Sequence, residues 1–381
     1  MSALVPDSDA FVRDALFRSA VWSPGEGGPR PGFVTSAELW ADAVGRGLRQ
    51  PGFRLVRDGK QLSTAETCRK AGIGHRTLDD VFQPNRVLEL HAAGATMVLQ
   101  GLQLSDPRLA RLANNLALDL GHAVQINAYL SPVAAKGLEL HFDFHDVFVL
   151  QLDGRKRWRV WEPLARTHQP VRGGPKEPMP TFDELGEPAM DLTLRAGDCL
   201  YLPRGFPHAA ETVDAASSHL TIGVMAPAWH QAVRHAVDEA VSDRATTLRA
   251  SIPGDVAGPP DLAAIAVHLD PDVVQQWMIR ETWKRQPATR LRPLVAPTID
   301  LGTELTITPG PLLWLLPSAD RVELGLGDRS LTLPAEAGPL LAALLTSDGS
   351  FTLADLDVAL DDDSRLVVGQ RLVIEGVVAP V

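Results

Sequence analysis

The sequence predicts an α+β protein in which a sandwich or barrel of short strands precedes a helical region. Between residues 81 and 227, short apolar runs are separated by turn residues at even spacing, which is typical of such all-β units. Residues 228–290 instead carry apolar residues at helical spacing. From about residue 300, strand-like runs return and helix-like segments follow them. These patterns predict three successive structural units.

Length and composition agree with this organisation. At 381 residues the chain is too long for one ordinary domain. We expect domains at 1–227, with a core at about 87–225, then at 228–295 and at 296–381. The apolar content of 45% and the charged content of 22% fit a soluble globular protein. The sequence has no apolar run of about eighteen residues, so we expect no membrane span.

Charge and cysteine content narrow the function classes. The net charge of −11 argues against broad nucleic-acid binding through bulk electrostatics. The two cysteines, Cys68 and Cys199, argue against a disulfide framework and favour a reducing compartment. The N-terminus carries acidic residues where a signal peptide would carry a basic leader. We therefore expect a cytoplasmic protein.

The first elements along the chain are predicted from apolar spacing and from turn residues. Residues 36–48 begin with a capping serine and have the spacing of a short helix. Residues 87–102 are predicted to form two strands around a glycine turn. Residues 106–121 are predicted to form an amphipathic helix closed by Gly121.

The remaining strands of the first domain are apolar or alternate apolar with polar residues. They are predicted within residues 123–132, 141–154, 156–163, 190–212 and 218–227. In the last domain, strands are expected within 303–317, 321–327 and 330–334, and helices within 336–347, 352–360 and 363–376.

Three potential metal ligands lie at the start of the predicted strand at 141–154. His141, Asp143 and His145 are two residues apart, so they share one face of a strand. Residues two apart lie roughly 6.6 Å apart along a strand and can reach one ion, whereas residues four apart lie roughly 13 Å apart. The three side chains therefore cannot all bind the same ion.

A third ligand must come from another strand, and His208 is the best candidate. It follows the turn at Gly197-Asp198 and the strand after that turn. Pro203 and Pro207 bracket a rigid loop that would direct His208 back towards the first two ligands.

His141 with Asp143 is the preferred pair, and Asp143 with His145 is the alternative. His145 is followed by another acidic residue and sits further into the strand. Two histidines and one carboxylate form the facial triad of non-haem Fe(II) enzymes, which leaves positions open for a bidentate keto acid and dioxygen. Zn²⁺, Mn²⁺ or Ni²⁺ could occupy the same ligands. The alternative without a metal is a polar strand rim with His208 in a surface loop.

The segments that carry these ligands resemble the JmjC-type ribosomal-protein hydroxylases. The resemblance rests on NAYLSP…KGLELHFDFHDVFVLQLDGRKRWRVW, GDCLYLPRGFPHAAET and SSHLTIG, and it is dense over about 87–225. It implies a cupin jelly-roll, that is, a double-stranded β-helix, which uses Fe(II), 2-oxoglutarate and O₂. It also implies a helical dimerisation domain and a winged-helix-like C-terminal domain. The first 80 residues match the family only loosely.

The resemblance also implies roles for individual residues. His141, Asp143 and His208 would bind iron. Lys156, in GRKRW, falls where the family places the basic residue that holds the distal carboxylate of 2-oxoglutarate, and a buried carboxylate does need a charged partner. Arg155 and Arg157 are rivals for this role. The alternative is that all these bases lie on a solvated face.

Asn127 and Tyr129, in QINAYL, match the family's N-x-Y pair, which lines the pocket near cosubstrate and substrate. The alternative is that they make ordinary polar contacts within the barrel. The family usually has Gly, Ser and Pro in the loop before the first ligand, whereas SPVAAKGLELH has Ala134, Ala135 and Lys136 there. Because this loop is expected near the mouth of the site, the substrate is expected to differ from the family's usual one. His219 is expected in the core or beside the site.

The C-terminal domain is not expected to bind DNA. Residues 311–381 contain eleven acidic residues against four arginines, and Asp361, Asp362 and Asp363 precede the last predicted helix. A winged-helix shape used for packing or protein contact is more plausible. The resemblance suggests a homodimer through 228–290, and packing within one chain is the alternative.

Together these observations and the resemblance predict a cytoplasmic Fe(II)- and 2-oxoglutarate-dependent dioxygenase that hydroxylates a side chain of a protein or peptide. The resemblance alone implies that the target is an arginine or histidine of a ribosomal protein. One alternative keeps the chemistry but acts on a biosynthetic precursor peptide or a small substrate. A second alternative is a non-catalytic metal-binding cupin that senses a ligand through its C-terminal domain. A third is a zinc or manganese cupin isomerase, which would act without O₂.

Overall fold

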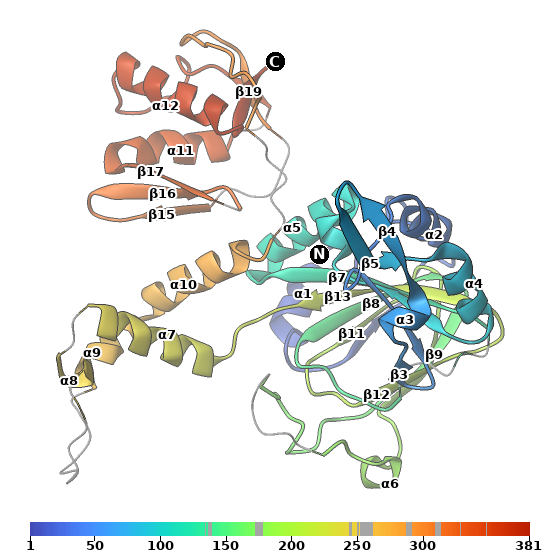
Figure 1. Cartoon of the computed structure of the whole chain (residues 1–381). Helices are drawn as coiled ribbons and strands as arrows, with labels where there is room; N and C mark the ends of the chain where they lie inside the picture. The colour runs from blue at the N-terminus through green and yellow to red at the C-terminus, as the bar shows by residue number, and fades with distance from the viewer. Residues whose placement is uncertain are drawn as a thin grey trace. The chain divides into compact units, whose positions relative to one another are not determined.

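The computed structural model describes two compact units. The first comprises Met1–Leu116 and Val124–Ala226, and the second comprises Ala117–Ala123 and Pro227–Val381 (Figure 1). The predicted boundary at 295/296 stays a prediction. The structure describes the whole chain except residues 134, 136–138, 172–177, 244–245, 250, 252–261, 287–291, 309–313, 328 and 348.

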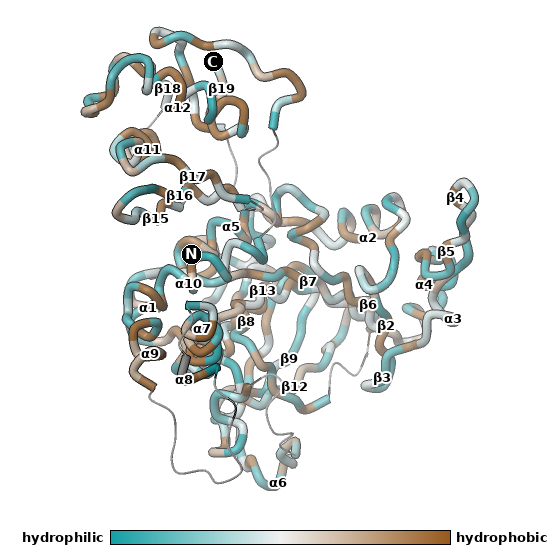
Figure 2. Tube along the Cα trace, turned by 60° about the vertical axis from the view of Figure 1, so that its left-hand side comes forward, coloured by the Kyte–Doolittle hydropathy of each residue, from teal (hydrophilic) through white to brown (hydrophobic). Residues whose placement is uncertain are grey.

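An eight-stranded sheet dominates the first unit, in the order β1-β11-β8-β13-β7-β6-β2-β3, with every neighbouring pair antiparallel. Figure 2 shows apolar residues concentrated along β6, β7 and β13. The strands are β1 (Val21–Ser23), β2 (Phe53–Arg57), β3 (Lys60–Gln61), β6 (Thr96–Leu99), β7 (Val124–Ser131), β8 (Asp146–Asp153), β11 (Cys199–Leu202) and β13 (Ser217–Val224).

A three-stranded antiparallel sheet packs against the main sheet. Its order is β10 (Met190–Arg195), β9 (Arg155–Val160) and β12 (His208–Thr212). Side chains of both sheets share one apolar core, to which Val149 and Leu200 contribute from the main sheet and Trp158 and Leu194 from the smaller one. The two sheets form the predicted double-stranded β-helix of a cupin jelly-roll.

Helices and one hairpin complete the first unit. The helices are α1 (Ser8–Asp14), α2 (Ser36–Gly45), α3 (Thr64–Thr67), α4 (Pro84–Ala92), α6 (Phe182–Leu185) and the first part of α5 (Pro107–Leu120), and the hairpin joins β4 (Cys68–Ile73) to β5 (Arg76–Phe82). Helix α5 is the helix predicted at 106–121, and Gly121 follows it with a φ of +69°. The helix predicted at 36–48 is α2, but its cap is Thr35, whose side chain accepts from the Glu38 amide.

The prediction of two strands at 87–102 was wrong in its first half. Residues up to Ala92 form α4, and only the segment after the Gly94 turn is a strand, β6. Pro84 occupies the first turn of α4, where a missing amide proton costs nothing. Val87 and Leu90, three residues apart, are the buried side chains of the helix. The helical spacing of these two residues therefore predicts the structure better than the two-residue spacing that suggested a strand.

The strand predicted from residue 141 begins only at Asp146. His141 makes a single β-bridge with His208, and the residues between it and Asp146 are not in a strand. From Asp146 to Leu152 every residue of β8 is buried, so the strand has no solvated face. The alternation of polar and apolar residues at 141–145 therefore belongs to an irregular segment at the strand's entrance.

The second unit contains a helical region and a mixed region. The helices are α7 (Trp229–Ser242), α8 (Thr246–Arg249), α9 (Ala263–Ala266), α10 (Pro271–Trp283), α11 (Gly338–Leu345) and α12 (Asp362–Ile374). Two three-stranded sheets have the orders β18-β14-β19 and β15-β16-β17. Their strands are β14 (Leu305–Ile307), β15 (Trp314–Pro317), β16 (Arg321–Gly325), β17 (Ser330–Pro334), β18 (Ser350–Phe351) and β19 (Val378–Pro380).

The helix predicted at 352–360 does not form. The Arg365 side chain instead donates hydrogen bonds to two carbonyl oxygens of this segment, those of Val358 and Leu360, at 2.8 Å each. Leu353 is fully buried and packs closely on Gly369, where an added Cβ would lie 2.3 Å from Leu353 Cδ1.

Part of the strand predicted at 303–317 lies outside the described residues. None of the helices in the described part of the chain is both long and apolar enough to cross a bilayer.

Candidate metal centre and cavity

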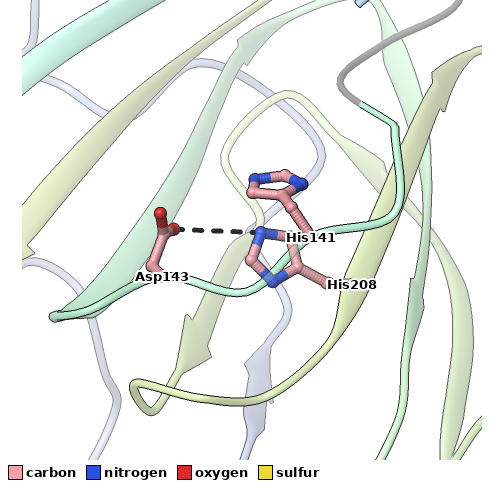
Figure 3. Close-up of side chains that lie close together, drawn as sticks. All are labelled: His141, Asp143 and His208. Carbon is pink, nitrogen blue, oxygen red and sulfur yellow. Dashed lines mark ion pairs between the residues drawn. The ribbon is translucent and has the colours of Figure 1, made fainter. Parts of the chain in front are cut away.

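His141, Asp143 and His208 converge on one point. One potential ligand atom of each lies within 4.8 Å of the others (Figure 3). His208 Nε2 is 3.9 Å from Asp143 Oδ2, and the two imidazole rings have centroids 4.2 Å apart. Of the two pairs that the sequence allowed, the structure therefore brings His141 and Asp143 to His208.

Main-chain hydrogen bonds hold the three residues in place. The His141 amide donates to the His208 carbonyl at 3.1 Å, and the His208 amide donates to the His141 carbonyl at 2.8 Å. The Gly205 amide donates to the Asp143 carbonyl at 2.9 Å. Gly205 has a φ of +86°, a conformation that favours glycine, and it forms the turn between Pro203 and Pro207.

Both histidines present Nε2 to the site. The Nδ1 of His141 lies 2.7 Å from the Glu139 carbonyl, and the Nδ1 of His208 lies 2.9 Å from the Phe206 carbonyl. A carbonyl oxygen only accepts, so each Nδ1 carries the proton and each Nε2 keeps its lone pair, as a metal ligand requires. Burial, with the nearby His141, holds the pKa of His208 well below its usual value, so this ring is neutral at pH 7.

His145 is not part of this group. Its ring packs against β13, so closely that a Cβ on Gly223 would lie 2.6 Å from His145 Cδ2. The residue after it, Asp146, is buried and accepts from the Tyr201 hydroxyl at 2.9 Å. His145 therefore packs at the entrance of β8, and the sequence order alone did not show this.

The triad lines a cavity of about 240 Å³ inside the jelly-roll. Both sheets contribute to it, which places the triad beside a chamber with both polar and apolar lining residues. The lining consists of Arg54, Val56, Thr96, Val98, Tyr129, His141, Asp143, Val147, Val149, Lys156, Trp158, Leu202, His208, Ala210, His219 and Thr221.

Lys156 is the buried base of the GRKRW run. It is 3% exposed, lines the cavity, and its Nζ donates to Ser131 Oγ at 3.3 Å. Burial lowers its pKa to about 8. Arg155 and Arg157 occupy the other parity of β9, where they are exposed and pair with Asp214 and Asp191. The structure therefore separates Lys156 from its two rivals.

Tyr129 and His219 form one wall of the cavity. They face each other in the β7–β13 register, and their rings stack with centroids 4.9 Å apart and an interplanar angle of 4°. Burial, and then the charge of Lys156, lower the pKa of His219 well below its usual value. Its Nδ1 is buried and has no hydrogen-bond partner among the described residues. His219 therefore contributes a neutral ring to the wall of the cavity.

Asn127 shares the face of Tyr129 but does not line the cavity as the structure describes it. Its Oδ1 accepts from the Gly101 amide at 3.0 Å and from Gln125 Nε2 at 3.3 Å.

In the atypical loop, Ala134 and Lys136 lie outside the described residues. Ala135 is buried, and its carbonyl accepts from Thr212 Oγ1 at 2.9 Å.

Sequence reasoning missed Arg54, which lines the cavity from β2. The signal was present in FRLVR, where Arg54 and Val56 alternate with the buried Phe53 and Leu55. An arginine on the strand face that points into the protein is unusual, but the sequence of one short strand does not show which of its two faces points inward.

Comparison with known proteins shows which proteins this chain is similar to. Residues 100–232 match the family model described as "JmjC domain". The chain is 33% identical over 184 residues to ribosomal oxygenase 2 of Bos taurus, covering 46% of this chain and 38% of that protein. It is 37% identical over 140 residues to ribosomal oxygenase 1 of Danio rerio, covering 36% and 25%. The chain thus spans about a quarter to two fifths of the length of these curated relatives.

The solved structure of YcfD, a ribosomal oxygenase from Escherichia coli in complex with cobalt and 2-oxoglutarate, shares the fold. It aligns with 99% of this chain and 98% of its own, at a TM-score of 0.59 and 22% identity. Residues 100–232 are therefore similar in sequence to a JmjC domain, and the chain shares the fold of the solved structure named above.

Proposed function

We propose that the protein is an Fe(II)- and 2-oxoglutarate-dependent oxygenase that hydroxylates a side chain of a ribosomal protein. The observation that carries the proposal is the presence of the His-Asp-His triad and of a buried lysine in one cavity of about 240 Å³. The curated relatives and the structural neighbour named above support it.

His141, Asp143 and His208 would hold the iron. The donor set is the facial triad that non-haem Fe(II) enzymes use, and both Nδ1 atoms are already occupied by carbonyls. When bound, iron and 2-oxoglutarate supply the oxidation, in which O₂ converts 2-oxoglutarate to succinate and CO₂ and one oxygen atom enters the target C–H bond. The protein's own residues hold the reactants and keep water out.

Lys156 would hold the distal carboxylate of 2-oxoglutarate. It makes no ion pair with a carboxylate in the described part of the chain, although it is almost completely buried. A buried ammonium without a counterion is unfavourable, and a dianionic cosubstrate removes that penalty. Ser131 would orient the ammonium, because its hydroxyl already accepts from Lys156 and from Thr96.

Tyr129 and Asn127 are proposed to act around the cosubstrate in different ways. Tyr129 lines the cavity beside the triad and would contact cosubstrate or substrate. Asn127 would shape the wall through its bonds to Gly101 and Gln125.

We propose an arginine or histidine of a ribosomal protein as the target, and a precursor peptide as the alternative substrate.

We also propose a homodimer through the helical region. Trp229 and Val233, four residues apart on α7, are 72% and 43% exposed, which gives this helix an uncovered apolar strip in one chain. No DNA partner is proposed, given the acidic C-terminal region. The cytoplasm remains the proposed location, and both cysteines are free.

The test is conversion of 2-oxoglutarate to succinate by the purified chain with Fe(II), ascorbate and O₂. We expect slow turnover without substrate, abolished in His141→Ala. Lys156→Ala should lose turnover at low 2-oxoglutarate and recover it at high concentration, while Arg157→Ala, the exposed base on the same strand, should behave as wild type. Ribosomal proteins would then be screened for a mass increase of 16 Da, which one added oxygen atom produces.

Two results would contradict the proposal. Failure to bind 2-oxoglutarate in the presence of Mn(II) would favour the ligand-sensing cupin. Chemical conversion of a substrate without O₂ would favour the cupin isomerase.

A further inference from the structure

Arg54 reaches the cavity through one continuous row of the main sheet. The strand registers pair Arg54 with Val98, Val98 with Tyr129, and Tyr129 with His219. All four residues line the cavity. Residues paired across antiparallel strands point to the same face, so Arg54 shares the inner face with Tyr129 and His219.

Arg54 lines the same cavity as the metal triad, and both influence Tyr129. The pKa of Tyr129 is raised by burial and by the nearby Asp143 carboxylate, and it is lowered by Arg54, which also hydrogen-bonds to it. Tyr129 therefore links Arg54 to the cavity that holds the triad, and a target side chain must enter this cavity to bring its C–H bond to the metal.

Part of the guanidinium has no partner. Arg54 Nε is buried without a hydrogen-bond acceptor among the described residues. A buried donor left unpaired is unfavourable, and an anion or an acceptor placed beside the guanidinium in the cavity would offset part of that cost.

Counting the charges in the cavity indicates that 2-oxoglutarate does not balance the charge of Arg54. The cavity lining contains two basic side chains, Arg54 and Lys156, and one carboxylate, Asp143. A divalent metal is balanced by Asp143 and one carboxylate of 2-oxoglutarate, and the second carboxylate balances Lys156. The partly buried Arg54 then has no counterion among the residues that line the cavity, so an uncharged or anionic group of the second reactant suits this position better than a cationic one.

We propose that Arg54 is a specificity-determining residue, which selects target side chains with an uncharged or anionic hydrogen-bond acceptor and rejects cationic ones. This inference rests on the proposed function. A neutral imidazole accepts a hydrogen bond from a guanidinium, whereas a second guanidinium offers only donors and repels the first. Of the two targets proposed above, the cavity therefore takes histidine and excludes arginine.

The test is a binding measurement that requires no turnover. Full-length protein loaded with Zn(II) and 2-oxoglutarate would be examined by saturation-transfer NMR at pH 8. The two probes are N-acetyl-histidine methylamide and N-acetyl-arginine methylamide at equal millimolar concentration. We expect at least fivefold stronger saturation of the histidine probe, and loss of that preference to within twofold in Arg54→Gln.

Two further variants make the result specific. Arg57→Gln removes an arginine of the same strand on the opposite parity, and it should bind as wild type. Arg54→Lys keeps the positive charge, so it should still reject the arginine probe even if it binds the histidine probe more weakly. Thermal unfolding would confirm that each variant is folded.

Equal or stronger binding of the arginine probe to wild type would overturn the inference. So would an absent histidine-probe signal, or an unchanged preference in Arg54→Gln. None of these results touches the proposed function, which would instead fail if wild type with Fe(II) produced no succinate and bound no 2-oxoglutarate.

Discussion

The main chains of His141 and His208 hydrogen-bond to each other in both directions, at 3.1 and 2.8 Å. This single β-bridge joins the segment before β8 to the first residue of β12. The backbone therefore positions two of the three potential ligands without help from a metal. Such a preformed site holds its ligands in place before the ion arrives.

Removing a triad residue should abolish tight metal binding. We expect His208→Ala and Asp143→Ala to lower the affinity for Mn(II), measured by calorimetry, by at least about 100-fold, because two remaining ligands hold the ion poorly. His145→Ala is the control, since its ring packs on Gly223 outside the triad. An equal loss in His145→Ala would revive the alternative ligand pair.

Lys156 should make the stability of the metal-free protein depend on pH. Burial lowers its pKa from 10.5 to about 8, so between these pH values the unfolded chain binds more protons than the native one. The contribution of Lys156 to the free energy of unfolding should therefore rise with pH, by roughly 2 kcal/mol between pH 8 and 10.

The Lys156→Met variant isolates this effect. It should be more stable than wild type at pH 7, because it removes a buried charge that has no counterion, and the difference should shrink towards pH 10. Urea unfolding of both proteins at several pH values measures it. A difference that stays constant with pH would show that the ammonium is better solvated than its 3% exposure implies.

Gly205 should be essential for the geometry of the triad. It has a φ of +86°, and an added Cβ would lie 2.2 Å from the Thr167 carbonyl oxygen. Gly205→Ala should shift the loop whose amide holds Asp143, weakening Mn(II) binding and destabilising the protein by more than about 1 kcal/mol. Gly186→Ala is the matched control, because Gly186 has a φ of +65° but no atom within 4 Å of its would-be Cβ. Equal Mn(II) affinities in the two variants would argue against a role for the loop.

Glu375 should be the most sensitive ionic residue of the second unit. Its carboxylate is 2% exposed and pairs with Arg292, Arg329 and Arg371 at 2.8 to 3.0 Å. Glu375→Ala leaves these guanidiniums without their shared partner, so we expect a loss of about 3 kcal/mol in chemical unfolding. The exposed Glu336→Ala should change stability by less than about 0.5 kcal/mol. A small effect at Glu375 would mean that water replaces the carboxylate.

The sequence by itself was enough to find the triad and the strands around it. Metal ligands are restricted to a few residue types, and His141 and Asp143 have the spacing that binding one ion requires. His208 follows turn residues that can be recognised locally. Helix α5 and the strands β7 and β9–β13 follow from local periodicity and turn residues in the same way. The short run at 87–92 was misassigned, because Leu88 and Leu90 have the spacing of a strand while Val87 and Leu90 have the spacing of a helix.

Only the tertiary structure decided which polar side chains face the cavity. Lys156, Arg155 and Arg157 are adjacent bases, and the pairing of β9 with β10 and β12 decides which parity is buried. Arg54 became part of the site because β2 pairs with β6, far from the triad in sequence. The physical reason is that parity within a strand is local, whereas the choice of the inner face depends on the strands and sheets packed against it.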